Sequence, residues 1–259
     1  MKLISKKKKS SESSADKARN VLTSDSKFAI VEGYKIARTN LIFSLTAQDN
    51  NCVAITSWSK GEGKSTATVN LAISFAKMDK KVLLIDTDLR RPNLHNLLKL
   101  KNDNGLTDVI ANLADFNDTV NHNVIASLDV MTSGAIPPNP SELLASPVFK
   151  DILIRAKEEY DYIIMDTPPL GVVADTLLLK DYIGGYVLVV RERITTHGDI
   201  ERALQNIHLA DSKVLGFLKV GCDMRQRGYG YKKYRYRYNY RYRYRYRYNN
   251  YNYNYYYRY

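Results

Sequence analysis

At residues 52–66 the sequence reads CVAITSWSKGEGKST, and this stretch points to one class of fold. A short apolar run is followed by a turn that contains Gly61 and Gly63, and helix-forming residues come directly after the turn. A buried strand, a glycine-containing loop and a helix in this order are typical of a phosphate-binding loop, or P-loop. The glycines allow backbone N–H groups to point at phosphate oxygens, and the start of the helix adds a partial positive charge.

The residues of this loop have expected parts in nucleotide binding. Lys64 is expected to contact the β- and γ-phosphates of ATP, and the Ser65 hydroxyl is expected to bind Mg²⁺. The general pattern has glycine where this chain has Trp58, so an ordinary turn is the alternative; the order of strand, loop and helix favours the P-loop. The predicted nucleotide-binding residues are Ser59, Lys60, Gly61, Glu62, Gly63, Lys64, Ser65 and Thr66.

Outside the loop, short apolar runs rich in β-branched residues alternate with helical patterns. We expect strands at residues 52–57, 82–85, 128–131, 162–165, 185–190 and 214–220, and helices at residues 26–45, 63–78, 147–160 and 197–209, with further helical segments from about residue 92. This alternation predicts an α/β fold of the P-loop NTPase type, with a mostly parallel central β-sheet and helices on both faces. Ligands bind such sheets at the carboxyl ends of the strands.

Acidic residues stand where two of the predicted strands end. Asp86 and Asp88 come directly after one strand, and Asp166 comes directly after another. Carboxylates in these positions can hold Mg²⁺ or accept a proton from an attacking hydroxyl, and capping of a helix is the alternative. Beside the P-loop they predict a catalytic group of Lys64, Asp86 and Asp88. The predicted metal ligands are Ser65, Asp86, Asp88 and Asp166, with ATP and Mg²⁺ as cofactors.

The formal net charge of +12 is concentrated at the two ends of the chain. Residues 1–25 read as a basic, flexible leader, and residues 225–259 contain nine Arg, two Lys and no acid, so the body between them is mildly acidic. The two cysteines have no metal-ligand spacing and indicate neither a disulfide framework nor a zinc site. We find no signal peptide and no apolar run long enough to span a bilayer, and we expect a cytoplasmic protein.

With these motifs in place, the chain resembles the bacterial tyrosine kinases (BY-kinases) of capsule and exopolysaccharide operons. It is most similar to the Gram-positive form, in which the kinase is a separate cytoplasmic chain. Lys64 and Ser65 match the Walker A positions, Asp86 and Asp88 match the Walker A′ motif, and Asp166 matches the Walker B acid. The resemblance covers residues 26–224 and implies that they form a P-loop tyrosine kinase domain.

Three further stretches bear on the resemblance. The sequence GAIPPNPSELL at residues 134–144 is a family signature that we expect to shape the rim of the site. Lys60 stands where the family usually has proline. The family's Glu-x-x-Arg-x-x-Arg oligomerisation motif is present as Glu32, Lys35 and Arg38, in which Lys35 keeps the charge but loses the bidentate fork of arginine. The resemblance implies a homo-oligomer, in the form of a ring.

The C-terminal tail, residues 225–259, is the predicted phosphoacceptor cluster. From Tyr229 onward 16 of 31 residues are tyrosine, and the absence of aliphatic residues predicts disorder. The alternatives are RNA binding through arginine and stacked tyrosine, self-association through cation–π contacts, and an inert extension. The predicted acceptors are Tyr229, Tyr231, Tyr234, Tyr236, Tyr238, Tyr240, Tyr242, Tyr244, Tyr246, Tyr248, Tyr251, Tyr253, Tyr255, Tyr256, Tyr257 and Tyr259.

The resemblance implies an ATP-dependent protein-tyrosine kinase that phosphorylates its own tail in trans and regulates capsule or exopolysaccharide synthesis and export. A tyrosine hydroxyl has a pKa of about 10 and needs a base near neutral pH. Asp86 is the preferred base and Asp88 a supporting group, with the opposite assignment left open.

The implied partners are a transmembrane adaptor that activates the kinase and recruits it to the inner face of the cell membrane, further copies of the chain, protein substrates such as sugar-nucleotide enzymes or glycosyltransferases, and a phosphotyrosine phosphatase. The alternative is a partition or septum-positioning ATPase that hydrolyses ATP to water and binds nucleic acid with its basic tail. Those ATPases carry a signature lysine where this chain has Ser59. Nucleic acid is therefore not expected among the partners.

Overall fold

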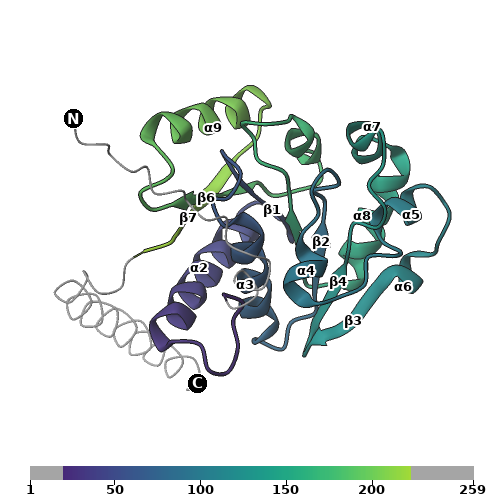
Figure 1. Ribbon diagram of the computed structural model, residues 1–259, viewed down its shortest axis with the longest axis horizontal. Helices are drawn as coiled ribbons and strands as arrows, with labels where there is room; N and C mark the ends of the chain where they lie inside the picture. Colours follow the sequence, from purple (N-terminus) through teal and green to yellow (C-terminus); the bar gives the residue numbers. More distant parts are fainter. Residues whose placement is uncertain (1–19, 223–259) are drawn as a thin grey trace, which may run out of the picture. The chain divides into compact units, whose positions relative to one another are not determined.

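The computed structural model describes residues 20–222 and is built around one β-sheet (Figure 1). Within this range seven strands follow the order β3-β4-β2-β5-β1-β6-β7, and each neighbouring pair is parallel except β3 with β4. The strands are β1 Cys52–Ser57, β2 Val82–Asp86, β3 Val120–Ile125, β4 Leu128–Met131, β5 Tyr162–Asp166, β6 Tyr186–Arg191 and β7 Val214–Val220. The predicted α/β fold with a mostly parallel sheet is confirmed.

Helices cover both faces of this sheet, as the alternation predicts. Their bounds are α2 Phe28–Thr46, α3 Lys64–Ala76, α4 Leu94–Leu98, α5 Leu106–Ile110, α6 Phe116–Thr119, α7 Pro140–Leu144, α8 Pro147–Glu159, the 3₁₀ helix η1 Asp175–Leu179 and α9 His197–Leu209. Apolar side chains of α2, α3 and α4 belong to the core on one face, and those of α5 to α9 and η1 belong to the core on the other.

The central strands read as continuous apolar runs because both of their faces are buried. In β1, Cys52 and Ala54 belong to one core, whereas Val53 and Ile55 belong to the other, and all four have no exposed surface. Successive side chains of a strand point to opposite faces, so a strand between two helical layers has no polar side.

Three elements differ from the expectation or were not foreseen by it. Strand β3 lies at the edge of the sheet, pairs irregularly with β4 and is polar (VNHNVI), so it gives little apolar pattern. The helices α7 and η1 have five residues each, which is too short for helical periodicity.

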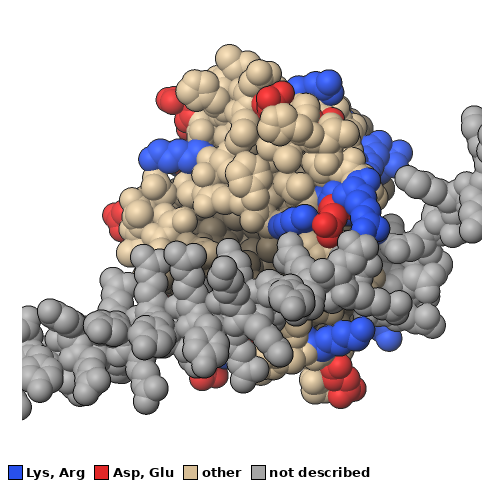
Figure 2. Space-filling view, turned by 90° about the vertical axis from the view of Figure 1, so that its left-hand side faces the viewer, with Lys and Arg blue, Asp and Glu red and all other residues tan. Residues whose placement is uncertain are grey.

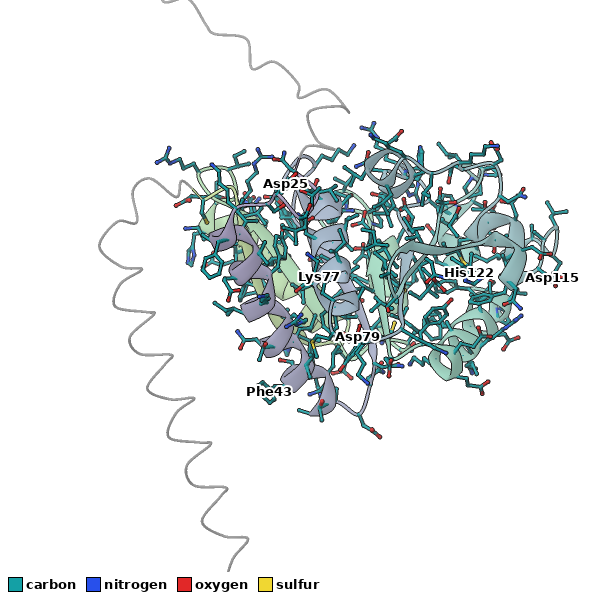
Figure 3. All side chains as sticks on the ribbon, turned by 90° about the horizontal axis from the view of Figure 1, so that it is seen from below. Asp25, Phe43, Lys77, Asp79, Asp115 and His122 are labelled. Carbon is teal, nitrogen blue, oxygen red and sulfur yellow. The ribbon has the colours of Figure 1, made fainter. Side chains whose placement is uncertain are left out.

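Helix α2 keeps part of its apolar surface exposed. Leu41 and Leu45 are buried, whereas Phe28 is 74% and Phe43 is 65% exposed. Figure 3 shows Phe43 pointing away from the sheet. On the side that Figure 2 presents, residues other than Lys, Arg, Asp and Glu form most of the described surface that is visible. Basic side chains stand at several separate places, and the largest group has an acid among them.

The two predicted end segments lie mainly outside the described residues. This applies to positions 1–19 of the leader and to the whole tail, including its sixteen tyrosines. In the part of the chain that the structure describes, no helix combines the length and the apolar character needed to cross a membrane.

Candidate active site

Sheet topology brings the three predicted motifs to one edge. Strands β2, β5 and β1 are neighbours and parallel, so their carboxyl ends lie side by side. Asp86 of β2 stands opposite Asp166 of β5, and Asp166 stands opposite Ile55 near the end of β1. The P-loop, Asp88 and Asp166 therefore meet at the carboxyl edge, where ligands bind sheets of this type.

The P-loop takes its shape from glycines and from an internal carboxylate. Gly61 and Gly63 have φ angles of +80° and +89°, a left-handed region that strains other residues. The buried Glu62 accepts a hydrogen bond from the Ser59 N–H at 2.9 Å and another from the Thr195 hydroxyl. These contacts tie the loop to the segment between β6 and α9.

Trp58, which replaces the usual glycine, packs against the chain that follows Asp166. A Cβ at Gly171 would lie 2.7 Å from Trp58 Cε2, so the lack of a side chain there makes room for the indole. The Gly171 N–H donates to the Trp58 carbonyl at 2.9 Å, and the Arg202 guanidinium lies 5.9 Å from the ring centroid. The P-loop and the loop after Asp166 are thereby held together.

Lys64 is the buried cation of the site. Its Nζ donates to Asp166 Oδ1 at 2.9 Å, lies 3.7 Å from Asp88 Oδ2, and donates to Ser65 Oγ at 3.3 Å. Burial lowers the pKa of Lys64, but the charges of Asp166 and Asp88 more than offset this, so the net pKa is raised. The ammonium stays charged and is held by the two carboxylates.

Asp166 has one oxygen with partners and one without. Oδ1 accepts from Lys64 and, at 2.9 Å, from the Thr68 hydroxyl, whereas Oδ2 is buried and has no hydrogen-bond partner. An unsatisfied buried carboxylate oxygen costs on the order of 1–3 kcal/mol or more, and a cation would relieve that cost. Asp166, Asp88 and the Ser65 hydroxyl are oxygen donors of the kind that Mg²⁺ prefers.

A fully protein-made metal cage is absent from residues 20–222, where no three His, Cys, Asp or Glu side chains cluster suitably. Mg²⁺ in phosphate-transfer sites usually takes one or two carboxylates and obtains its other ligands from phosphates and water. The donors at this edge fit that kind of site.

Asp86 differs from Asp88 in its hydrogen bonds. Asp86 Oδ2 accepts from the N–H groups of Asn93 and Leu94 at 3.0 Å each, and its Oδ1 accepts from the Asp88 N–H at 3.2 Å. Both oxygens are thus engaged, and the carboxylate anchors the start of α4, the capping role that was the alternative. Asp88 Oδ1 accepts from the Arg91 N–H, while Oδ2 faces Lys64.

Burial and the charge of Asp166 raise the pKa of Asp86 to about 7, which predicts a pH-dependent stability. The folded protein keeps a proton that the unfolded chain has released, so this group's contribution to stability falls as the pH rises from about 4 to about 7. Between about pH 5 and pH 8 the nucleotide-free wild type should lose roughly 2 kcal/mol more stability than Asp86→Asn, as measured by urea unfolding.

Asp161→Asn is the matched control for this measurement. Backbone hydrogen bonding from Lys81 lowers the pKa of Asp161, so its titration lies below this pH window and its difference from wild type should stay constant. Equal pH dependence of wild type and Asp86→Asn would contradict the prediction.

Several residues of this region carried no prediction. Arg90 forms an ion pair with Asp175, and Ser141 of the 134–144 signature joins them. Arg90 stands two residues after Asp88, so its place in the sequence was a usable signal, whereas Asp175 stands in no motif. Thr68 was signalled only by its position one helical turn after Lys64.

The residues of the oligomerisation motif lie on α2, apart from this site. Lys35 forms an ion pair with Glu32 at 2.7 Å on the surface. The Arg38 guanidinium donates to the Ser74 carbonyl of α3 within the same chain. Their part in oligomerisation stays a prediction.

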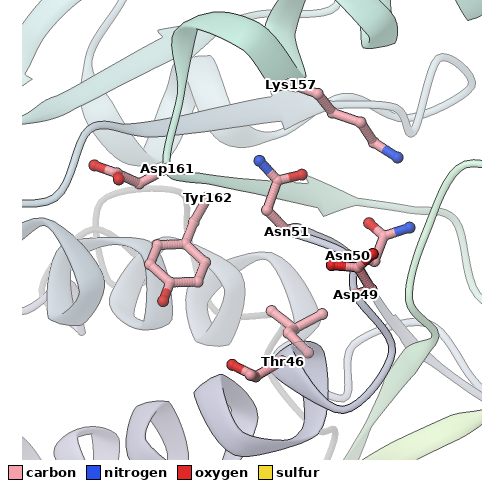
Figure 4. Close-up of a pocket in the computed structure, with 8 residues that line it drawn as sticks. Thr46, Asp49, Asn50, Asn51, Lys157, Asp161 and Tyr162 are labelled. Atoms are coloured by element: carbon pink, nitrogen blue, oxygen red, sulfur yellow. The ribbon is translucent and has the colours of Figure 1, made fainter.

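A cavity of about 410 Å³ lies at the opposite edge of the sheet (Figure 4). Its lining includes Asn51, which precedes β1, and Asp161, which precedes β5, so it is at the amino ends of these strands. Asn51 donates to the Tyr160 carbonyl and Asp161 accepts from the Lys81 N–H. The cavity is therefore separate from the P-loop edge.

The P-loop and the carboxylates beside it define the chain as a P-loop protein that binds ATP. A family model described as an AAA domain matches residues 50–214. The chain is 41% identical to tyrosine-protein kinase YwqD of Bacillus subtilis (strain 168) over 204 residues. This match covers 78% of this chain and 86% of that relative. It belongs to the family of bacterial tyrosine-protein kinases.

Solved structures agree with this assignment. The kinase domain of Escherichia coli tyrosine kinase ETK matches with a TM-score of 0.72 and 34% identity, over 75% of this chain and 76% of that one. The septum site-determining protein MinD from Pyrococcus horikoshii OT3, complexed with Mg-ADP, matches with a TM-score of 0.55 and 25% identity. This match covers 65% of this chain and 69% of that one. The positioning ATPases are thus the more distant relatives.

Proposed function

We propose that this chain transfers the γ-phosphoryl group of ATP to tyrosine hydroxyls, including those of its own tail in trans. The observation that carries the proposal is the meeting of Lys64 with Asp166 at 2.9 Å and with Asp88 at 3.7 Å beside the P-loop. A cation for the transferred phosphoryl group and carboxylates for a proton or a metal are the groups that phosphoryl transfer needs.

ATP binding exchanges the partners of Lys64. The phosphate oxygens compete with Asp166 and Asp88 for the ammonium, while the P-loop N–H groups and the start of α3 bind the phosphates. Mg²⁺, held by Ser65 and Asp166, would neutralise phosphate charge when bound. Asp86 is not needed as a ligand in this arrangement, since its own oxygens already accept backbone hydrogen bonds.

The hydrogen bonds favour Asp88 over Asp86 as the group that accepts the phenol proton. Both oxygens of Asp86 accept from backbone N–H groups, whereas Asp88 Oδ2 faces Lys64 and is released when phosphate takes that ammonium. Asp86 then acts by fixing the chain from Asp88 to α4. This reverses the preference drawn from the sequence and uses the assignment that was left open.

The cellular role and the partners extend this proposal. Family membership supports control of capsule or exopolysaccharide synthesis, activation by a transmembrane adaptor at the inner face of the cell membrane, sugar-nucleotide enzymes or glycosyltransferases as substrates, and reversal by a phosphotyrosine phosphatase. Phe28 and Phe43 are exposed apolar side chains of α2, the helix that carries Glu32 and Lys35, and they support a contact of this helix with another copy.

Incubation of the purified chain with γ-labelled ATP and Mg²⁺ tests the proposal. We expect label on tyrosines of residues 229–259, located by mass spectrometry, and no stimulation by DNA. Release of free phosphate that DNA stimulates, with an unlabelled chain, would instead favour a positioning ATPase. EDTA present from the start of the incubation should prevent labelling, because the proposed metal neutralises the phosphates during the transfer.

A further inference from the structure

A buried carboxylate outside the predicted site joins three segments that surround it. Asp175, the first residue of η1, has a side chain that is only 4% exposed. Its Oδ2 accepts from Arg90 Nε at 2.6 Å, and its Oδ1 accepts from Arg90 Nη2 at 3.1 Å and from the Ser141 hydroxyl at 2.7 Å. Arg90 Nη2 also donates to Ser141 Oγ at 3.1 Å. We call Arg90, Ser141 and Asp175 the brace.

The brace is attached to the turn that carries Asp88. In this turn the Arg91 N–H donates to both the carbonyl and the carboxylate of Asp88, and Leu89 is buried in the core. Arg90 follows at once, and the two-point grip on its guanidinium fixes its direction as a single contact would not. The turn is thus held by an apolar anchor on one side and by the brace on the other.

The brace is attached equally to the loop that follows Asp166. The hydroxyl of Thr176, the neighbour of Asp175, donates to the Pro168 carbonyl at 2.7 Å, and the Thr56 hydroxyl donates to the same carbonyl at 3.0 Å. Pro168 lies two residues after Asp166. One rigid connection therefore runs from the Asp88 turn through Asp175 to the Asp166 loop and the end of β1.

Such a connection is needed because the site gathers like charges. Asp88 and Asp166 are both held near Lys64 in the nucleotide-free protein. When phosphate takes the ammonium, Asp88 loses the cation that holds it near Asp166 in the nucleotide-free protein. A turn held only by its backbone would move outward, whereas a turn fixed through Arg90 keeps its place.

We propose that Asp175 is a positioning residue for phosphoryl transfer: through Arg90 and Ser141 it holds Asp88 at its working distance from Asp166 and Lys64. This inference rests on the proposed tyrosine-kinase activity. It gives the 134–144 signature a physical role, because its Ser141 is the member that links α7 to the brace.

The test compares kcat and KM of variants in the full chain. Asp175→Asn should lower kcat for tail phosphorylation about 10- to 100-fold, because a displacement of about 1 Å in a reacting group costs that much. The KM for ATP should change less than about threefold, since the P-loop contacts are untouched. Arg90→Lys keeps the positive charge but loses the two-point hydrogen bonding of the guanidinium, so it should lower kcat as much as Asp175→Asn does.

Two further comparisons separate positioning from loss of fold. The double variant Arg90→Lys, Asp175→Asn should be no slower than either single variant, as expected for residues that act as one unit. Glu159→Gln, in the exposed ion pair of Glu159 with Arg155 at 3.0 Å, should leave both constants unchanged. If Asp175→Asn does not fold, Ser141→Ala decides, with a smaller loss of kcat at unchanged KM.

If wild type labels tyrosine and the variants Asp175→Asn and Arg90→Lys are as active as wild type, this inference is wrong and the proposed function stands. If Asp175→Asn does not fold, a folded Ser141→Ala variant with the kcat of wild type would overturn the inference as well. A wild type that labels no tyrosine would instead overturn the proposed function.

Discussion

Replacing Lys64 by methionine should lower tyrosine phosphorylation on the order of 1,000-fold or more. Methionine keeps the length of the side chain but brings no charge to the transferred phosphoryl group. The buried ammonium is also the shared counter-charge of Asp166 and Asp88, so both the resting site and the reaction depend on it. The measurement is the initial rate of tail phosphorylation at saturating Mg-ATP, with phosphotyrosine counted by mass spectrometry.

The same change should destabilise the nucleotide-free protein by roughly 3–5 kcal/mol near neutral pH, because it breaks a buried ion pair and leaves its carboxylates unpaired. Acidification should restore part of this loss, since protonated carboxylates need no counter-charge. Lys77→Met, an exposed change just after the last residue of α3, the helix that Lys64 begins, is the control and should affect neither the rate nor the stability. More than about a hundredth of wild-type activity in Lys64→Met would refute the assigned role.

The convergence of Lys64, Asp88 and Asp166 could be predicted from sequence because it depends on local signals and one topological rule. Each residue follows a recognisable apolar strand, and parallel strands place their carboxyl ends at one edge. The position of β5 between β1 and β2 had no such signal. That strand order brings Asp166 within 2.9 Å of Lys64, although 102 residues separate them.

The hydrogen bonds of Asp86 and the role of Asp175 could not be predicted for a different reason. A motif shows that an acid is present, but its partners depend on where the chain returns after it. Asp86 is engaged by amides seven and eight residues later, where the chain turns into α4. Asp175 meets Arg90 across 85 residues through the packing of η1, an element too short to leave a periodic pattern.

Helix α2 illustrates the limit of a motif that is carried over without its surroundings. Glu32, Lys35 and Arg38 keep the spacing of the oligomerisation motif, yet Arg38 bonds to the Ser74 carbonyl of its own chain. The weak apolar periodicity of α2, with Phe28 and Phe43 exposed, did not reveal which side faces α3. The oligomer therefore remains a prediction, with the exposed phenylalanines of α2 in its support.

A mixture of two inactive proteins should regain tail phosphorylation if transfer occurs between chains. One partner is Lys64→Met, which has tail tyrosines but no working site. The other is a full chain with all sixteen tail tyrosines changed to phenylalanine, which has a site but no acceptor. Each alone should give no phosphotyrosine in the tail, and the mixture should give it on the Lys64→Met chain only, as mass spectrometry of the two tails would show.

The place where the tail begins makes this experiment decisive. A Cβ at Gly63 would lie 3.6 Å from Val220 Cγ2, so β7 ends beside the P-loop of its own chain. Nine further residues lead to Tyr229, which span at most about 30 Å, and the tail from there spans at most about 100 Å. Chain length thus permits transfer within one chain, and the expectation of transfer between chains rests on the oligomer.

Concentration separates the two routes in the wild type as well. Below the concentration at which copies associate, the initial rate should rise with the square of enzyme concentration for transfer between chains, and in proportion to it for transfer within one chain. A doubly changed chain, with Lys64→Met and the phenylalanine tail, should not rescue Lys64→Met in a mixture. Wild-type activity together with a silent mixture would mean that each chain phosphorylates its own tail.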